Sequence, residues 1–294
     1  MKKILISGVS VIDFIFQVES IPTSYEKYRA KNASISGGGV AANAAVAIAK
    51  LNGNPSLVSR LGKDEIGLMI KNGLLKEKVN IDNVFIFDGH KSSFSSVYIN
   101  KNGDRQVMNF RDDTLPVDAS VITKIEEHDA YLVDSRWTEG ALQTLKVAKE
   151  YGAPGIVDAE ETVTKEIIKE ASHIAFSMSG LIEFTKIESK LDALKSIKNI
   201  SSAWVCVTDG ENGVYFLEDN ELRHIPAKKI TVKDTLGAGD VWHGAFALSL
   251  AEGNDVVNAI KFASSAATLK CKFFGGRDGF PNRKQVDQFL MEHK

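Results

Sequence analysis

The stretch with the clearest chemical potential is DTLGAGD, residues 234–240, in which two aspartates flank a glycine-rich turn. The apolar run that follows it predicts a helix. The backbone amides of Gly237, Ala238 and Gly239 would lie in the first turn of this helix, where free N–H groups and the helix dipole attract anions. Asp240 is then either a helix cap or a base that takes a proton from a hydroxyl while the amides stabilise a transferring phosphoryl group.

A second glycine cluster, SISGGGVAANAAVA, also precedes a predicted helix. The six residues from Gly37 to Ala42 match the G-x-G-x-x-A pattern of dinucleotide-binding turns. That pattern normally follows the first core strand, whereas this one lies well after the first apolar strand of the chain. Three interpretations stay open: a nicotinamide site, tight backbone packing, and close approach of a polar small molecule to exposed amides.

A third glycine turn lies in VTDGENGVYF, where one predicted strand ends at Thr208-Asp209-Gly210 and the next begins at Gly213. A hairpin turn accounts for these residues. The carboxyl ends of strands in α/β folds are also where ligands bind, so a ligand-binding role is the alternative.

The elements that must position these turns follow an α/β pattern. Apolar strands predicted at 129–134, 153–158, 173–177 and 203–210 alternate with helical segments at 139–152, 164–171 and 188–199. This alternation is typical of βαβ units around a mostly parallel sheet. Other predicted helices cover 39–51, 64–79, 238–253, 255–271 and 283–293, and a hairpin is predicted at 213–227.

Several extended segments interrupt this alternation. They cover 9–19, 27–36 and a hairpin from Phe94 to Phe110 with a turn at Asn102-Gly103. We expect a small antiparallel sheet, built from insertions at about 11–36 and 90–112, that projects from the main domain. The apolar face of such a sheet needs cover, either from a substrate pocket or from the sheet of a second subunit.

Composition excludes several classes of protein. The 294 residues are 44% hydrophobic and 25% charged, with a formal net charge of −2, which gives no electrostatic case for a nucleic-acid or anionic-membrane partner. Cys206 and Cys271 are too few for a disulfide framework or a zinc site. No apolar run approaches the ~20 residues of a membrane span, and Asp13 interrupts the first apolar stretch. A cytoplasmic protein is expected.

Two of the glycine motifs together resemble a known family. DTLGAGDVWHGAFA resembles the carboxy-terminal signature of the ribokinase-like (phosphofructokinase-B type) carbohydrate kinases, and SGGGVAANAAVAIAKLNGNPSLVSRLGKDEIG resembles their amino-terminal signature. The likeness runs from Ile4 to the GGRDGFP region. It implies a single kinase domain over residues 1–294, folded as a three-layer α/β/α sandwich with a mostly parallel central sheet and a β-sheet lid. It also implies ATP- and Mg²⁺-dependent phosphorylation of a sugar hydroxyl and a homodimer through the lids.

The resemblance also assigns roles to individual residues. Asp240 matches the general base, and the amides of Gly237, Ala238 and Gly239 match the anion hole. Positions that hold sugar hydroxyls are matched by Asp13, Gly38, Gly39 and Asn43. Positions on the nucleotide side are matched by Thr208, Gly210, Gly237, Gly239 and Cys271.

The sequence departs from the family at the expected magnesium motif. Many members carry N-x-x-E, whereas FSMSG places Ser177 and Gly180 there. Magnesium would then be organised by other groups, for which Asp158 and Glu160 are candidates. Asp234 is a candidate cation ligand, and a monovalent-cation site beside it is compatible with the resemblance.

The subgroup that VDSRWTEGA, KYRAKN and ATLKCKFFGGRDGFP most resemble is the bacterial sulfofructose kinases. Under this resemblance Lys27, Asn109 and Arg136 would recognise a sulfonate. A guanidinium fork, a point charge and an amide suit an anionic head group. Alternatively, Lys27 is a solvated lid charge, Arg136 pairs with a nearby acid or stacks on Trp137, and Asn109 is a turn-facing polar residue of the hairpin.

The leading hypothesis is therefore an ATP-dependent kinase for 6-deoxy-6-sulfofructose. Fructose, fructose 6-phosphate and ribose are the alternative substrates. Two further classes stay open: a nicotinamide-dependent oxidoreductase and a catalytically silent sugar-binding protein.

Overall fold

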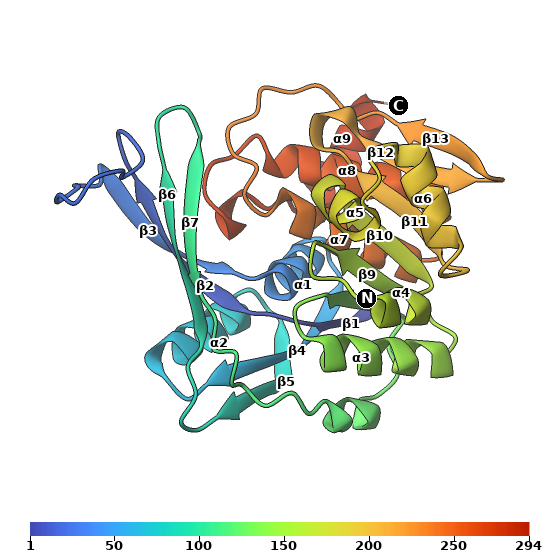
Figure 1. The fold of residues 1–294 in the computed structure, drawn as a ribbon, viewed down its shortest axis with the longest axis horizontal. Coiled ribbons are helices and arrows are strands. Elements are labelled where there is room, and N and C mark those ends of the chain that lie inside the picture. The colour runs from blue at the N-terminus through green and yellow to red at the C-terminus, as the bar shows by residue number, and fades with distance from the viewer. Residues whose placement is uncertain (294) are drawn as a thin grey trace.

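The computed structural model describes residues 1–293 and shows two β-sheets that stand side by side (Figure 1). The larger sheet has nine strands in the order β13-β12-β11-β10-β9-β8-β1-β4-β5, and its pairs are parallel from β11 to β5. Its strands are β1 (Lys3–Ser7), β4 (Asn54–Gly62), β5 (Asn80–Phe87), β8 (Ala130–Asp134), β9 (Gly155–Ala159), β10 (His173–Ser177), β11 (Trp204–Thr208), β12 (Val214–Glu218) and β13 (Glu221–Ile225). The predicted mostly parallel sheet is confirmed, with the 213–227 hairpin as its antiparallel edge.

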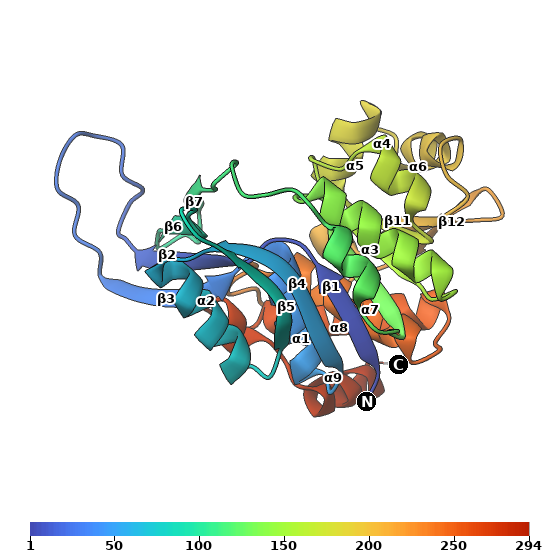
Figure 2. The same ribbon diagram turned by 90° about the horizontal axis from the view of Figure 1, so that it is seen from below.

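Helices cover both faces of this sheet (Figure 2). One face carries α3 (Thr138–Glu150), α4 (Lys165–Glu170), α5 (Met178–Thr185) and α6 (Lys190–Lys198). The other carries α1 (Val40–Lys50), α2 (Glu65–Lys76), α7 (Ala238–Ala251), α8 (Val256–Lys270) and α9 (Arg283–Glu292). Successive residues of a strand pack into the hydrophobic cores on opposite faces of the sheet. In β9, Ile156 lies in the core beneath α1, α7 and α8, and Val157 lies in the core beneath α3–α6. Within residues 1–293, no helix is long and apolar enough to cross a bilayer.

The sequence analysis did not predict α5. Its start is nonetheless marked, because the Ser177 side chain accepts a hydrogen bond from the amide of Gly180 and so caps the helix. The helix is short, and its apolar residues follow directly on the apolar strand β10, so the change in periodicity is hard to detect.

The smaller sheet is the predicted lid. It contains β2 (Val11–Gln17), β3 (Asn32–Gly38), β6 (Ser93–Ile99) and β7 (Arg105–Phe110), in the order β3-β2-β6-β7. The prediction of an antiparallel sheet was wrong for one pair, because β2 and β6 run parallel. The cause is topological: the chain passes through β3, α1, β4, α2 and β5 between these two strands, and this long connection brings β6 alongside β2 in the same direction.

Candidate active site

The amino terminus of α7 presents the glycine-rich turn with which the sequence analysis began. Gly237 is the N-cap residue in a left-handed conformation (φ 77°), and among the described residues no side chain caps the helix. The amide of Ala238 donates to the carbonyl of Thr235 (3.1 Å), so this member of the predicted anion hole is already bonded. A Cβ added at Gly239 would meet no described atom within 4 Å, which leaves open space beside the first turn.

Asp240 follows in that first turn and is held from two other parts of the chain. Its Oδ2 accepts a hydrogen bond of 2.7 Å from Nδ2 of Asn43 in α1. Oδ1 of Asn43 in turn accepts from Nε of Arg277 (2.8 Å), and Nη2 of the same guanidinium donates to the carbonyl of Gly38 (3.1 Å). The amide of Asn43 is therefore fixed at both ends, and it orients the Asp240 carboxylate.

The three consecutive glycines make room for this arrangement. A methyl group at Gly37 would overlap the guanidinium of Arg277, and one at Gly38 would overlap the carboxylate of Asp13. Gly39 has φ 89° and lies against the backbone of Ser10, so it needs glycine for conformation as well as for space. Close packing around two charged side chains thus explains the cluster without a dinucleotide.

The surroundings of Asp240 favour the protonated acid. Desolvation raises its pKa to about 7, and the negative charge of Glu160 acts in the same direction. The hydrogen bond from Asn43 and the positive charge of Arg277 oppose the shift. A carboxylate with a pKa near neutrality is well suited to accept a proton in a reaction.

A row of polar side chains crosses the lid sheet at one level. Asp13 on β2 pairs in register with Ser36 on β3 and with Ser95 on β6, which pairs with Asn109 on β7. Residues directly opposite one another share a face of the sheet. The Asn109 amide donates to the Ser95 hydroxyl (3.0 Å), and Ser95 is hydrogen-bonded to Asp13. Asp13 also interacts electrostatically with Arg277, so this row faces the Asp240 cluster.

Arg136 lies at the edge of this cluster. It follows the carboxyl end of β8, where its amide donates to Asp134 (2.9 Å) and its guanidinium pairs with Glu160 after β9. The negative charge of Glu160 contributes to the raised pKa of Asp240. Arg136, as the ion-pair partner of Glu160, is therefore close to the site. Arg111, which the sequence analysis did not select, has a lowered pKa because burial desolvates its guanidinium and, to a smaller extent, because the positive charge of Arg136 is nearby.

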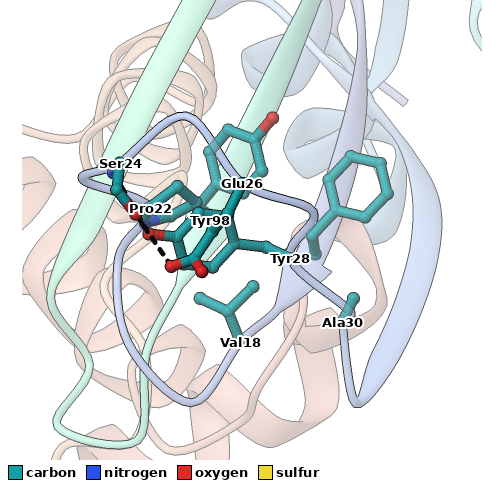
Figure 3. Close-up of a pocket in the computed structure, with 8 residues that line it drawn as sticks. Val18, Pro22, Ser24, Glu26, Tyr28, Ala30 and Tyr98 are labelled. Atoms are coloured by element: carbon teal, nitrogen blue, oxygen red, sulfur yellow. Dashed lines mark hydrogen bonds between the residues drawn. The ribbon is translucent and has the colours of Figure 1, made fainter.

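Lys27 does not join the cluster. It is exposed on the loop between β2 and β3, which projects away from the helices of the main domain (Figure 2). This loop folds around Tyr28, whose hydroxyl is hydrogen-bonded to the Ser24 hydroxyl (2.7 Å) and the Ser24 amide (3.1 Å). Figure 3 shows the resulting pocket, with Tyr28 and Glu26 beside Tyr98 of β6, and residues of the Asp240 cluster do not line it.

The residues expected on the nucleotide side lie at three places: the end of β11, the end of α8, and the start of α7, where Gly237 and Gly239 have already been described. Thr208 ends β11, with its hydroxyl directed at the carbonyl of Phe176 (3.3 Å), and Gly210 follows with φ 52° and open space around its α-carbon. Cys271 is the C-cap residue of α8 and is partly buried, which raises the pKa of its thiol.

The positions that could supply a magnesium ligand, namely Gly180, Asp158 and Glu160, differ in whether a carboxylate there could reach the ion. A side chain at Gly180 would lie 2.6 Å from the carbonyl oxygen of Ala159, so no acidic residue fits there. Asp158 is buried and pairs with Nδ1 of His243 (3.0 Å). Glu160 is partly exposed, and its Oε2 is paired with Arg136, so it could reach a metal ion only alongside that ion pair or in place of it. Within residues 1–293, no group of three or more His, Cys, Asp or Glu side chains is placed to hold a metal ion.

Asp234 does not fit the expected cation site. Its Oδ1 accepts from the amide of Leu236 (2.9 Å), and its Oδ2 accepts from the amide of Gly275 (3.0 Å) and from Nζ of Lys270 (3.0 Å). The same ammonium also donates to the Asp234 carbonyl (3.0 Å). The Lys270 ammonium therefore already binds two of the oxygens that Asp234 could offer to a cation.

The sequence analysis missed Arg277, Lys270, Glu160 as a partner of Arg136, and His243. The signal for Arg277 was its place in GGRDGFP, a segment used only for the resemblance. Lys270 had a weaker signal: it is one of two lysines among the apolar residues of TLKCKFF, where an unpaired buried charge would be unfavourable.

The profile of the pfkB family carbohydrate kinases matches residues 1–283. The ribokinase of Bacillus subtilis (strain 168) is 27% identical over 298 aligned residues, covering 99% of this chain and 100% of that protein. A crystal structure from Agrobacterium tumefaciens, provisionally named a ribokinase, is 31% identical with a TM-score of 0.92 and covers 99% of this chain and 98% of its own.

The fold is also that of Arabidopsis thaliana ribokinase, solved with ribose and ATP, at a TM-score of 0.85, 23% identity and 98% coverage of both chains. The nicotinamide interpretation of the glycine cluster is therefore wrong. Since the family profile spans almost the whole sequence, the chain belongs to the pfkB family of carbohydrate kinases, which are ATP-dependent phosphotransferases that act on sugars.

Proposed function

We propose that this kinase phosphorylates a primary hydroxyl of a ketose and that its substrate is 6-deoxy-6-sulfofructose, converted to the 1-phosphate. The observation that carries the reaction type is the Asp240 carboxylate at the uncapped start of α7, with its pKa raised to about 7. The observation that favours an anionic sugar is the presence of Arg136 and Arg111 near the same cluster.

At the reacting centre, Asp240 accepts the proton of the sugar hydroxyl as that oxygen attacks the γ-phosphate. Asn43 and Arg277 hold the carboxylate in position. The amide of Gly239 lies in the first turn of α7, which no described side chain caps, and it stabilises charge on the phosphoryl oxygens. Asp13, in the polar row of the lid, binds sugar hydroxyls opposite Asp240.

The remaining expected residues serve the nucleotide. Thr208, Gly210 and Cys271 contact ATP, and Glu160 holds Mg²⁺ together with the nucleotide phosphates. The ion supplies neutralisation of phosphate charge when it is bound.

The anionic end of the sugar would lie near Arg136 and Asn109. Arg136 pairs with Glu160, so a sulfonate would compete with this carboxylate for the guanidinium. The nearby charge of Arg111 lowers the cost of that exchange, because two arginines favour one additional anion.

Lys27 enters this proposal through a homodimer. Ile35 and Met108 lie in one row of the lid sheet, on the face opposite the Asp13 row, and are 58% and 72% exposed. A second lid would cover these apolar side chains. Because the β2–β3 loop projects away from its own site, dimerisation would bring Lys27 toward the site of the other protomer. Sedimentation velocity should detect the dimer, and Met108→Lys should weaken it.

Ribose or fructose is the alternative substrate. Two observations favour a neutral sugar: the Bacillus subtilis relative is named a ribokinase, and Arg136 is already paired with Glu160. If Arg136 stays paired with Glu160 when the sugar binds, its guanidinium cannot bind an anionic substituent of the sugar.

The test is kcat/KM for sulfofructose, fructose 6-phosphate, fructose and ribose, with the native enzyme and with Arg136→Gln. We expect sulfofructose to be preferred, and the variant to lose roughly tenfold or more for it, the cost of removing a hydrogen bond to a charged group. Activity on fructose should change little.

Arg223→Gln is the matched control, because Arg223 pairs with Glu218 at the far edge of the large sheet (3.1 Å). A preference for a neutral sugar that Arg136→Gln leaves unaltered would reject the anionic substrate and support the alternative.

A further inference from the structure

Lys270 is a fully buried charged side chain beside the glycine-rich turn. It lies in the last turn of α8, and its side chain is 0% exposed. Its Nζ donates to both the carboxylate Oδ2 and the main-chain carbonyl of Asp234, each at 3.0 Å. Lysine is almost never fully buried without such a partner, so this position is a specific feature of the chain.

Each oxygen atom of Asp234 accepts at least one hydrogen bond. Two backbone amides, those of Leu236 and Gly275, complete the set of donors to its carboxylate. The Asp234–Lys270 pair is electrically neutral, so a second cation would gain no net attraction there. It would also have to replace N–H donors that the oxygens already bind.

The pair also stabilises the backbone that leads into α7. The carbonyl of Cys271, next to Lys270, accepts from the amides of Lys233 (2.8 Å) and Asp234 (3.3 Å). The end of α8 and the residues before Gly237 therefore form one hydrogen-bonded unit, and the ammonium lies inside it. Displacement of this unit would move the amides at the start of α7.

We propose that the Lys270 ammonium is a tethered replacement for a monovalent cation at Asp234. It supplies the single positive charge that the carboxylate and the carbonyl share, and so it positions the first turn of α7 without an ion from solution. Lys270 is in this view a positioning residue, and the kinase does not depend on K⁺. The inference rests on the family's kinase activity but not on the identity of the sugar.

The first experiment measures the rate of ADP formation in tetramethylammonium buffers, with KCl added at constant ionic strength. The native enzyme should show no response to K⁺. Lys270→Met should lose on the order of 10²-fold in kcat, the scale expected for a small misplacement of catalytic groups, and KCl should restore part of that loss.

The second experiment needs no sugar. Thermal unfolding with ADP bound is recorded with and without KCl, since an ion that binds only the folded state raises the midpoint. We expect K⁺ to raise the midpoint of Lys270→Met and to leave that of the native enzyme unchanged.

Lys198→Met is the matched control, because Lys198 also ends a helix and donates to two carbonyls, those of Ser202 (3.0 Å) and Ala203 (2.8 Å). It should behave as the native enzyme does in both experiments. Activation of the native enzyme by K⁺ would overturn the proposal, even if Lys270→Met did not fold. The proposal would also be overturned if Lys270→Met folded and K⁺ changed neither its rate of ADP formation nor its thermal midpoint. A failure of the substrate proposal would change the sugar required and leave the unfolding result intact.

Discussion

The two aspartates of DTLGAGD lie six positions apart in one turn, yet they have opposite surroundings. Asp234 receives two amides and a buried ammonium, so its charge is fully compensated. Asp240 receives one side-chain hydrogen bond, from Asn43, and its pKa is raised to about 7. A compensated carboxylate is stable and unreactive, whereas an under-compensated one accepts a proton readily. This difference indicates that Asp234 stabilises the fold and that Asp240 takes part in the reaction.

Replacing Asp240 should have the largest effect on activity. Asp240→Asn keeps the size of the side chain but removes the base, so kcat should fall by at least about 10²-fold. Sugar binding, followed by calorimetry, and the thermal midpoint should be retained. Turnover close to that of the native enzyme would remove Asp240 from the mechanism.

Replacing Asp234 should affect stability more than chemistry. Asp234→Asn leaves the Lys270 ammonium buried without its counter-charge, and loss of one partner of a buried pair costs about 3 kcal/mol or more of unfolding free energy. Denaturant titration measures this loss. Asp287→Asn is the control: its pair with Arg283 is partly exposed, and its loss should cost less than about 1 kcal/mol. Equal losses in the two variants would contradict the contrast between the aspartates.

The acidic limb of the pH–rate profile reports on Asp240. The carboxylate is the active form, so the rate should fall as the pH drops below about 7, where the carboxylate becomes protonated. The charge of Glu160 raises this pKa, so Glu160→Gln should move the limb to lower pH. Glu161→Gln is the control, since the Glu161 carboxylate is hydrogen-bonded to Ser179 and the charge that acts on Asp240 comes from Glu160. A limb that does not move in Glu160→Gln would indicate a different titrating group.

Arg277 should shift the same limb in the opposite direction. Its guanidinium lowers the pKa of Asp240, so Arg277→Met should raise the pH at which activity appears. Loss of its bond to Asn43 should also loosen the carboxylate and lower kcat. Shifts of the same sign in Arg277→Met and Glu160→Gln would show that charge does not control the base.

Much of the fold was predictable because its signals are local. Alternating apolar strands and helices indicated the parallel sheet, and the extended segments indicated the lid. The pairing direction of β2 and β6 was not predictable, since an isolated strand carries the same pattern for parallel and antiparallel neighbours. The short helix α5 escaped detection because its apolar run continues that of β10.

The sequence by itself determined the family, the glycine turn and the choice of Asp240, because these depend on residue order within short segments. Only the tertiary structure decided how each charge is compensated. Arg277 meets Asn43 across 234 positions, and Lys270 meets Asp234 across 36. Which basic side chain reaches which carboxylate depends on how the helices pack together, and electrostatic interactions follow distance in space rather than distance along the chain.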